Sequence, residues 1–193
     1  MEITYEQYGP AHADQLVAFL CGDTWPFHAT AAVDPAEARR RIADGRYEGR
    51  DNRTFWITVD GERAGLVRLM DLRDDTPLFD LRLRSAYRGR GIGGRALAWL
   101  TTHLFTEFPH VRRIEGTTRQ DNEAMRRAFR RSGYAKEAHH RDAWPAPDGE
   151  FRDAVGYAIL RRDWACGTTT PPEWDDEPGP SGDDGAGRRR GGL

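Results

Sequence analysis

Hydrophobic and polar residues alternate along the first third of the chain in patterns that predict strands and helices. We expect a short strand at residues 2–8 and a helix at 11–20, whose apolar side carries leucine, valine and phenylalanine. Two runs rich in β-branched and aromatic residues then flank Asp60-Gly61. Because both residues tolerate the positive φ of a tight turn, these runs predict a β-hairpin.

The remaining pattern completes an α+β chain. Asp34-Pro35-Ala36-Glu37 is typical of a helix start, with Asp34 as N-cap, Pro35 at the first position and Glu37 completing a capping-box pattern. The further segments expected are strand 77–83, helix 92–105, strand 113–118, helix 122–131, and strands 134–144 and 151–160. This order predicts a mixed, mostly antiparallel central sheet of about seven strands flanked by four helices.

Size and charge indicate one soluble globular domain. The 193 residues are 38% hydrophobic and 31% charged, with a formal net charge of -2. That balance gives no electrostatic case for nucleic acid or membrane as partner, and no apolar run approaches the roughly 20 residues of a membrane span. The N-terminus lacks the layout of a signal peptide, so we expect a cytoplasmic protein. Two cysteines, Cys21 and Cys166, build neither a disulfide framework nor a zinc site.

The composition changes at Thr168. From there the chain, TTTPPEWDDEPGPSGDDGAGRRRGGL, is rich in Gly, Pro and Asp and has no apolar period. Such a segment cannot bury enough apolar surface to order itself. We therefore expect one folded domain at residues 1–167 and a disordered tail at 168–193.

A glycine loop, RGRGIGG at residues 88–94, lies between the strand at 77–83 and the helix that follows. Closely spaced glycines let the backbone approach a ligand, and amides at a helix start face negative charge, so the loop is built to bind phosphate. Arg88 and Arg90 could add contacts at its rim. The loop also satisfies the dinucleotide pattern G-x-G-x-x-G, but the surrounding strands lack the alternating βα units of that fold. The lysine of a P-loop is missing, since Arg95 follows the last glycine.

The same stretch also fits a third sequence motif. Arg88-Gly89-Arg90-Gly91-Ile92-Gly93 fits Gln/Arg-x-x-Gly-x-Gly/Ala, the acetyl-CoA loop of the GNAT superfamily, and NEAMRRAFRRSGY from Asn122 resembles that family's Asn-led helix. The chain resembles the family over residues 2–164 and looks closest to the branch of ribosomal-protein N-terminal acetyltransferases.

This resemblance implies an N-acetyltransferase that transfers the acetyl group of acetyl-CoA to a primary amine by direct attack in a ternary complex, releasing CoA. The acceptor would be a small molecule or a peptide N-terminus. A non-catalytic sensor of acyl-CoA and a dinucleotide-dependent enzyme remain as alternatives. The sequence leaves monomer and homodimer open.

The resemblance also assigns cofactor contacts. Loop amides would hold the pyrophosphate, and the backbone of Leu81 and Leu83 would pair with the pantetheine arm and polarise the acetyl carbonyl. Asn122 would contact the pantetheine region, cap the helix, or do both. The implied cofactor set is Leu81, Leu83, Arg88, Gly89, Arg90, Gly91, Ile92, Gly93, Gly94, Asn122 and Phe129.

Two positions depart from the family pattern. Phe129 stands where many members have a tyrosine that protonates the departing thiolate, and Met125 stands where the related branch often has serine. A side-chain acid is therefore not identified, and water, or no dedicated acid, takes its place.

The attacking amine must be neutral, so a base or a water path is expected. Asp80, within the central strand PLFDLRL, is the first candidate, because a carboxylate there is costly unless it is paired or functional. Its alternative role is an ion pair with Arg82. Glu115 on the next strand is the second candidate, and its alternative is a salt bridge with an arginine.

The acceptor pocket is expected between the loop that joins the first two helices and the turn that joins the last two strands, as the resemblance implies. Trp25, Phe27 and His28 from that loop, with Trp144, are the candidate substrate-binding residues. Trp25 and Phe27 could instead close the core, and His28 could be a surface histidine. No metal site is expected, because the pair His139 and His140 has no acidic or cysteine partner at metal-site spacing.

Overall fold

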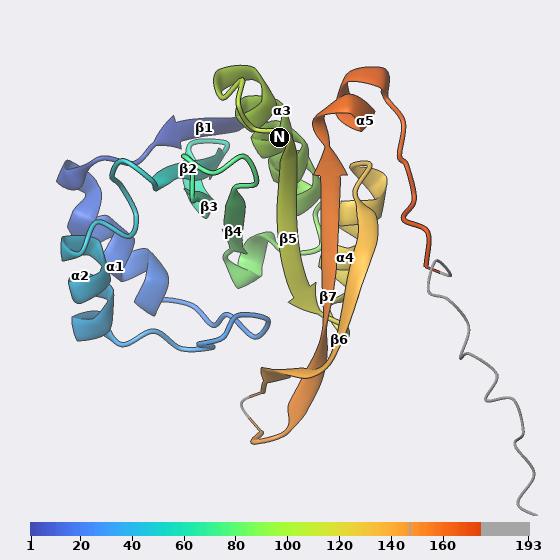
Figure 1. Cartoon of the computed structure of the whole chain (residues 1–193). Helices are drawn as coiled ribbons and strands as arrows, with labels where there is room; N and C mark the ends of the chain where they lie inside the picture. The colour runs from blue at the N-terminus through green and yellow to red at the C-terminus, as the bar shows by residue number, and fades with distance from the viewer. Residues whose placement is uncertain (147, 175–193) are drawn as a thin grey trace, which may run out of the picture.

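The computed structural model describes residues 1–146 and 148–174, which form a seven-stranded sheet with helices on both faces (Figure 1). In chain order the elements are β1 Ile3–Gln7, η1 Pro10–His12, α1 Ala13–Cys21, α2 Pro35–Ala43, β2 Arg53–Val59, β3 Glu62–Met70, β4 Leu78–Leu83, η2 Ser85–Tyr87, α3 Ile92–Glu107, β5 Arg113–Arg119, α4 Glu123–Arg131, β6 Ala135–Pro145, β7 Phe151–Leu160 and α5 Arg161–Cys166. The predicted α+β class and element order are confirmed.

One described helix was not predicted. The short α5, Arg161–Cys166, follows β7 directly, and its six residues are too few to show a helical period in the sequence. The four predicted flanking helices are present with it, so the described chain holds five α-helices.

The sheet has the strand order β1-β2-β3-β4-β5-β7-β6. Each neighbouring pair is antiparallel except β4 and β5. A dinucleotide-binding domain needs parallel βα units around its glycine loop. This topology excludes that alternative.

Two apolar clusters, one on each face of the sheet, bury it between helices. On β2, Phe55 and Ile57 belong to the cluster that includes α3, whereas Trp56 between them belongs to the cluster of α1. The alternation follows from the period of two in a strand. Sheet and helices therefore form three layers, and any cleft that crosses the sheet has walls from both helical layers.

Local signals behave as the sequence predicts, with one exception. The Asp34 carboxylate accepts hydrogen bonds from the amides of Ala36 and Glu37, as an N-cap does. Glu37 does not complete the capping box, because its carboxylate pairs with arginines one turn further along α2. Asp60 and Gly61 have φ values of 48° and 87° and close the β2–β3 hairpin.

The sheet opens between β4 and β5. Six residue pairs join β3 to β4, whereas β4 and β5 pair only at Leu78 and Glu115. Beyond Leu78 the two strands diverge, as Figure 1 shows below the middle of the sheet. The sheet thus has a splayed position at its centre, beside the strand that leads into the glycine loop.

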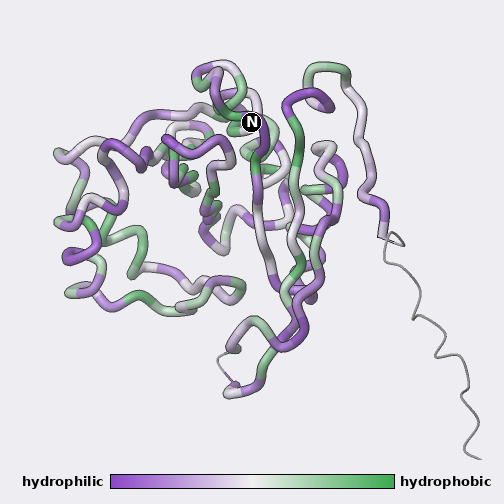
Figure 2. Tube along the Cα trace, viewed as in Figure 1, coloured by the Kyte–Doolittle hydropathy of each residue, from purple (hydrophilic) through white to green (hydrophobic). Residues whose placement is uncertain are grey.

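The edge strand β6 is mostly exposed, and Figure 2 shows hydrophilic residues along much of its length. Charged side chains on an edge strand oppose pairing with another chain. No helix in the described ranges is long and apolar enough to cross a membrane.

The first residues beyond the predicted domain boundary stay in contact with the domain. Thr168, Thr169 and Thr170 hydrogen-bond to the domain: the Thr170 amide and hydroxyl donate to the buried carboxylate of Asp163 at 2.9 and 2.8 Å, and the Thr169 hydroxyl donates to the Gly133 carbonyl. The boundary at residue 167 stays a prediction, and these contacts tie residues 168–170 to the domain. The remaining prediction of a disordered tail falls mainly on 175–193, which lie outside the described residues.

Candidate active site

The glycine loop turns sharply into α3. Gly89 and Gly91 have φ values of 75° and 78°, in the left-handed region that favours glycine, and Gly91 is the N-cap of α3. A Cβ added at Gly89, Gly91 or Gly94 would meet no atom within 4 Å, so the loop faces open space. The first amides of a helix lack partners within it, so this loop presents hydrogen-bond donors to that space.

We call the space beside the loop the glycine-loop cleft. It has a volume of about 390 Å³. Its lining includes most of the predicted cofactor residues: Leu81, Leu83, Arg88, Gly89, Gly91, Gly93, Gly94 and Asn122. The predicted residues Arg90, Ile92 and Phe129 do not line it. Ile92 and Phe129 are buried in the core, and Arg90 lies over the ring of Tyr87.

Arg88 lines the cleft, but its guanidinium already donates hydrogen bonds to backbone carbonyls. Its Nε donates to the Leu83 carbonyl at 2.9 Å, and its Nη2 donates to the Thr24 carbonyl at 2.5 Å. Arg88 thus ties the glycine loop to the segment between α1 and α2. Two cations that the sequence analysis did not single out, Arg127 and Arg131 of α4, also line this cleft. Their spacing of four residues on one helix was the available signal.

The splay exposes backbone groups of β4 to this cleft. The Glu115 amide donates to the Pro77 carbonyl, so the carbonyl of Pro77 faces β5. Because backbone groups alternate along a strand, those of Leu81 and Leu83 face the same side. The Leu83 carbonyl is bonded by Arg88, and β5 has diverged before it reaches Leu81. The amide and carbonyl of Leu81 therefore face the opening.

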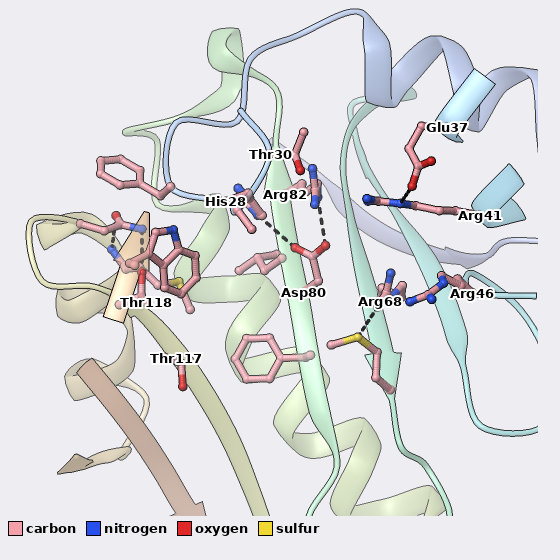
Figure 3. A pocket seen from close by; sticks show the side chains of 18 of the residues that line it. His28, Thr30, Glu37, Arg41, Arg46, Arg68, Asp80, Arg82, Thr117 and Thr118 are labelled. Atoms are coloured by element: carbon pink, nitrogen blue, oxygen red, sulfur yellow. Dashed lines mark hydrogen bonds and ion pairs between the residues drawn. The ribbon is translucent and has the colours of Figure 1, made fainter. Parts of the chain in front are cut away.

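A second cleft of about 510 Å³ lies on the other side of the splay, and we call it the acceptor cleft (Figure 3). It is walled by the segment after α1, by α2, and by β3, β4 and β5. Of the predicted substrate-binding residues, Phe27, His28 and Trp144 line it. Trp25 does not. It is buried in the core, its Nε1 donates to the Leu20 carbonyl at 2.8 Å, and it borders only the glycine-loop cleft.

The segment that carries Phe27 and His28 is fixed from both ends. The Trp25 amide donates to the Ala31 carbonyl, and the His28 amide donates to the Trp25 carbonyl. The guanidinium of Arg119 lies 5.1 Å from the Phe27 ring centre and donates to the Pro26 carbonyl. The segment is therefore held against the end of β5, across the splay from β4.

His28, Asp80 and Arg82 form a chain of polar contacts in the acceptor cleft. His28 Nε2 lies 3.0 Å from one Asp80 carboxylate oxygen, and Arg82 Nε donates to the other at 3.0 Å. His28 is partly buried, with 24% of its side chain exposed, and is not a surface histidine. Its Nδ1 is buried and has no hydrogen-bond partner among the described residues.

Burial disfavours the charged form of Asp80, but the positive charges of Arg82 and Arg68 and the hydrogen bond from His28 outweigh burial and hold the pKa of this carboxyl well below its ordinary value. Of the two roles expected for Asp80, base or ion-pair partner of Arg82, the structure shows the ion pair. A carboxylate so stabilised is a weak proton acceptor.

Glu115 lies outside both clefts. Arg113 Nη1 donates to its carboxylate at 2.5 Å, and the same guanidinium donates to Glu137. The structure thus places the second predicted base in a salt bridge on β5, away from the open part of the splay.

Asn122 caps α4 and also lines the cleft in which its cofactor contact was predicted. Its Oδ1 accepts from the Met125 amide as the N-cap of α4, and its Nδ2 donates to Thr118 Oγ1 at 3.0 Å. It also lines both clefts, as does Met125. Phe129 is buried and stacked on Tyr157, with ring centres 4.7 Å apart, so no side-chain acid stands at the positions of the family's tyrosine or serine.

The two clefts meet in the splay. The residues that line both are Phe27, His28, Leu81, Asn122 and Met125. One cleft is bordered by the amides of a glycine loop, and the other by aromatic and charged side chains. A ligand in each would come into contact beside His28 and the open backbone of Leu81.

Comparisons with known proteins agree with this geometry. Residues 3–135 match the family described as Acetyltransferase (GNAT) domain. Spermidine N(1)-acetyltransferase of Escherichia coli (strain K12) is 23% identical over 132 residues, which are 67% of this chain and 70% of that protein.

Two solved structures show the same fold. Mycobacterium smegmatis RimJ in complex with CoA-disulfide matches with a TM-score of 0.69 and 21% identity, covering 87% of this chain and 91% of that one. RimL, a ribosomal L7/L12 α-N-protein acetyltransferase in complex with coenzyme A, matches with a TM-score of 0.69 and 20% identity over 82% and 93%. With more than half of its length matched by the family model, the chain belongs to the GNAT family of N-acetyltransferases, whose acetyl donor is acetyl-CoA.

Proposed function

We propose that the chain acetylates a primary amine with acetyl-CoA bound in the glycine-loop cleft and the amine in the acceptor cleft, and that His28, positioned by Asp80, moves the proton. The meeting of the two clefts at five shared residues carries this proposal. It allows direct attack within one complex, with no covalent stage on the protein. The names of related enzymes, which acetylate spermidine or ribosomal proteins, agree with an amine acceptor.

The cofactor's pyrophosphate fits the loop because the residues around it supply both space and charge. Gly89, Gly91 and Gly94 leave room for the backbone to approach phosphate oxygens, and the amides that open α3 donate to them. Arg127 and Arg131 add positive charge from α4. The Leu81 amide then stands as a preorganised donor for the carbonyl oxygen of the thioester, where negative charge develops.

His28 replaces Asp80 as our candidate base. The ion-paired Asp80 carboxylate accepts the hydrogen bond from Nε2–H, which leaves the lone pair on Nδ1. Asp80 therefore holds one tautomer of the ring, and imidazoles exchange protons in the pH range near neutrality. This division of roles is that of a positioning carboxylate and a reacting imidazole.

A single group, His28, can carry the proton through the whole acetyl transfer. The amine nitrogen bonds to the carbonyl carbon, the carbon–sulfur bond breaks, and His28 takes the proton that the nitrogen gives up. The same imidazolium can return that proton to the departing thiolate, because His28 borders both clefts. No separate acid at Phe129 or Met125 is then required.

Substitution of His28 tests this proposal. We expect His28→Gln to lower kcat by roughly 10²–10⁴-fold, the range of lost acid–base catalysis, with acetyl-CoA affinity by calorimetry unchanged. Thiol release from acetyl-CoA across a panel of primary amines gives the rate. His140→Gln is the matched control, because His140 is exposed on β6 and lines neither cleft.

The pH dependence separates a reacting imidazole from a structural one. Loss of a proton-transferring group changes how kcat depends on pH, so the pH–rate profile of His28→Gln should differ in shape from that of the wild type. A variant with the wild-type profile and rate would refute the role of His28. Tight acetyl-CoA binding without thiol release for any amine would instead favour the sensor alternative.

A further inference from the structure

The wall of the acceptor cleft carries a surplus of positive charge. Its arginines are Arg40, Arg41, Arg46, Arg68 and Arg82, and its carboxylates are Glu37, Asp44 and Asp80. Five guanidinium groups thus face three carboxylates, which leaves two positive charges uncompensated when His28 is neutral. A cleft with low-dielectric walls concentrates such a field on whatever enters it.

Two of these arginines, and the carboxylate of Asp44, form no ion pair among the described residues. Arg40 and Arg41 pair with Glu37, and Arg82 pairs with Asp80. Arg46 and Arg68 form no ion pair in the part of the chain that the structure describes. Figure 3 shows their guanidinium groups pointing into the same part of the cleft, from the segment after α2 and from β3.

Arg68 is poorly satisfied where it stands. Its Nη2 donates to the Met70 sulfur, a weak acceptor, and its Nε is buried with no partner among the described residues. The ring of Tyr47 lies 5.4 Å from its guanidinium carbon. Buried guanidinium groups normally bond to carboxylate or phosphate oxygens, so this one has donor capacity left for an anionic ligand.

The sheet places this cation next to the reacting groups. Arg68 is directly opposite Asp80 in the β3–β4 ladder, so both side chains lie on the face that forms the cleft. His28 bonds to Asp80 from the other side. The backbones of Arg68 and Asp80 are therefore one strand spacing, about 5 Å, apart.

We propose that the acceptor is a primary amine that also carries an anionic group, in the simplest case a carboxylate, and that Arg68 and Arg46 bind that group. This inference rests on the proposed function and adds the chemistry of its acceptor. The amine then reaches the junction of the two clefts while the carboxylate meets the uncompensated cations. A polyamine would bring further positive charges into a cleft that is already positive, which opposes its binding.

A matched set of amines tests the charge preference. 5-Aminopentanoate, pentylamine and 1,5-diaminopentane share a five-carbon chain and differ in the group at the far end. We expect kcat/KM for 5-aminopentanoate to exceed that for pentylamine by roughly 10–100-fold, the value of a charge-assisted hydrogen bond, and 1,5-diaminopentane and spermidine to be poorer than pentylamine. Peptide amides with Asp or Ala as second residue distinguish a peptide side chain from a small molecule as the source of the carboxylate.

Arginine variants locate the effect. Arg68→Gln and Arg46→Gln should each bring the ratio of kcat/KM for 5-aminopentanoate to kcat/KM for pentylamine most of the way towards one. Arg50→Gln should change neither, because Arg50 is exposed and lines neither cleft. Arg68→Lys keeps the charge and should retain part of the preference if Arg68→Gln proves unstable.

The outcomes are distinct for the two proposals. Equal or better use of 1,5-diaminopentane, or a preference that survives both glutamine substitutions, overturns the anionic acceptor and leaves acetyl transfer in place. Calorimetric titration of N-acetyl-5-aminopentanoate in the presence of CoA is independent of catalysis. Binding that requires Arg68 without any thiol release would support the anion site and refute the proposed reaction.

Discussion

Replacing Gly91 with alanine tests the left-handed bend on which the glycine loop depends. Gly91 has φ 78° and is the N-cap of α3, and a Cβ there would meet no atom within 4 Å. The cost is therefore conformational and not steric. For an L-residue in this region it is about 1–2 kcal/mol. In a chain of this size each kcal/mol lowers Tm by about 2–4 °C, so we expect a fall of about 2–8 °C.

Gly93→Ala is the matched control two residues later. Gly93 lies in the first turn of α3, and its added Cβ would be 3.6 Å from a Leu83 methyl, an ordinary contact. Alanine gains about 0.5–1 kcal/mol over glycine in a helix. The family pattern also accepts alanine here. Gly93→Ala should therefore melt slightly higher than the wild type and bind acetyl-CoA as well.

Thermal unfolding with and without acetyl-CoA measures both effects in one experiment. A strained loop that relaxes would misplace the amides that open α3, so Gly91→Ala should lose at least roughly tenfold in affinity. Tenfold removes about 1.4 kcal/mol of ligand stabilisation at saturating acetyl-CoA. If Gly91→Ala melts and binds like Gly93→Ala, the left-handed bend is not what positions the cofactor.

Three further changes test the packing around the site. Gly65→Ala would place a Cβ against the Arg82 carbonyl oxygen, closer than atoms can approach. It should lower the free energy of unfolding by about 1–3 kcal/mol in chemical denaturation, and it should lower acetyl-CoA affinity by displacing β4. An unchanged denaturation midpoint would show that β4 shifts without cost. Thr170→Ala removes the hydroxyl that donates to the buried Asp163 carboxylate, so it should lower the free energy of unfolding by roughly 1–3 kcal/mol, whereas Thr168→Ala should leave it nearly unchanged. Equal midpoints for the two variants would show that the Thr170 hydrogen bond does not stabilise the domain. Burial raises the pKa of Tyr5 to about 12, so the unfolded chain ionises first, and the stability that Tyr5 contributes below pH 10 should decline as pH rises towards 12. Tyr5→Phe should flatten that decline in alkaline denaturation, and an identical profile would exclude Tyr5 as its source.

Signals between residues close together in the sequence predicted most elements of the fold. Asp34 before Pro35 began a helix where the pattern indicated, and Asp60-Gly61 closed the predicted hairpin. The glycine loop was recognisable because its function needs backbone conformations that only glycine adopts readily. These features depend on neighbours within a few residues, so they can be read along the chain.

The assembly of the site could not be read in that way. His28 and Asp80 are 52 residues apart, and their contact depends on how the segment after α1 crosses the splay between β4 and β5. The same packing left Glu115 outside both clefts and moved Trp25 into the core. Periodicity indicates that a side chain faces a sheet surface, but it does not say which distant side chain it meets there.

The amino-acid pattern thus determined the order of elements and the position of the glycine loop, since short-range backbone preferences and capping bonds suffice for both. The pairing of His28 with Asp80, and the gathering of Arg46 and Arg68 on one wall, came from the tertiary fold. Charge interactions depend on distance in space and on burial, and both are set only when strands and helices pack.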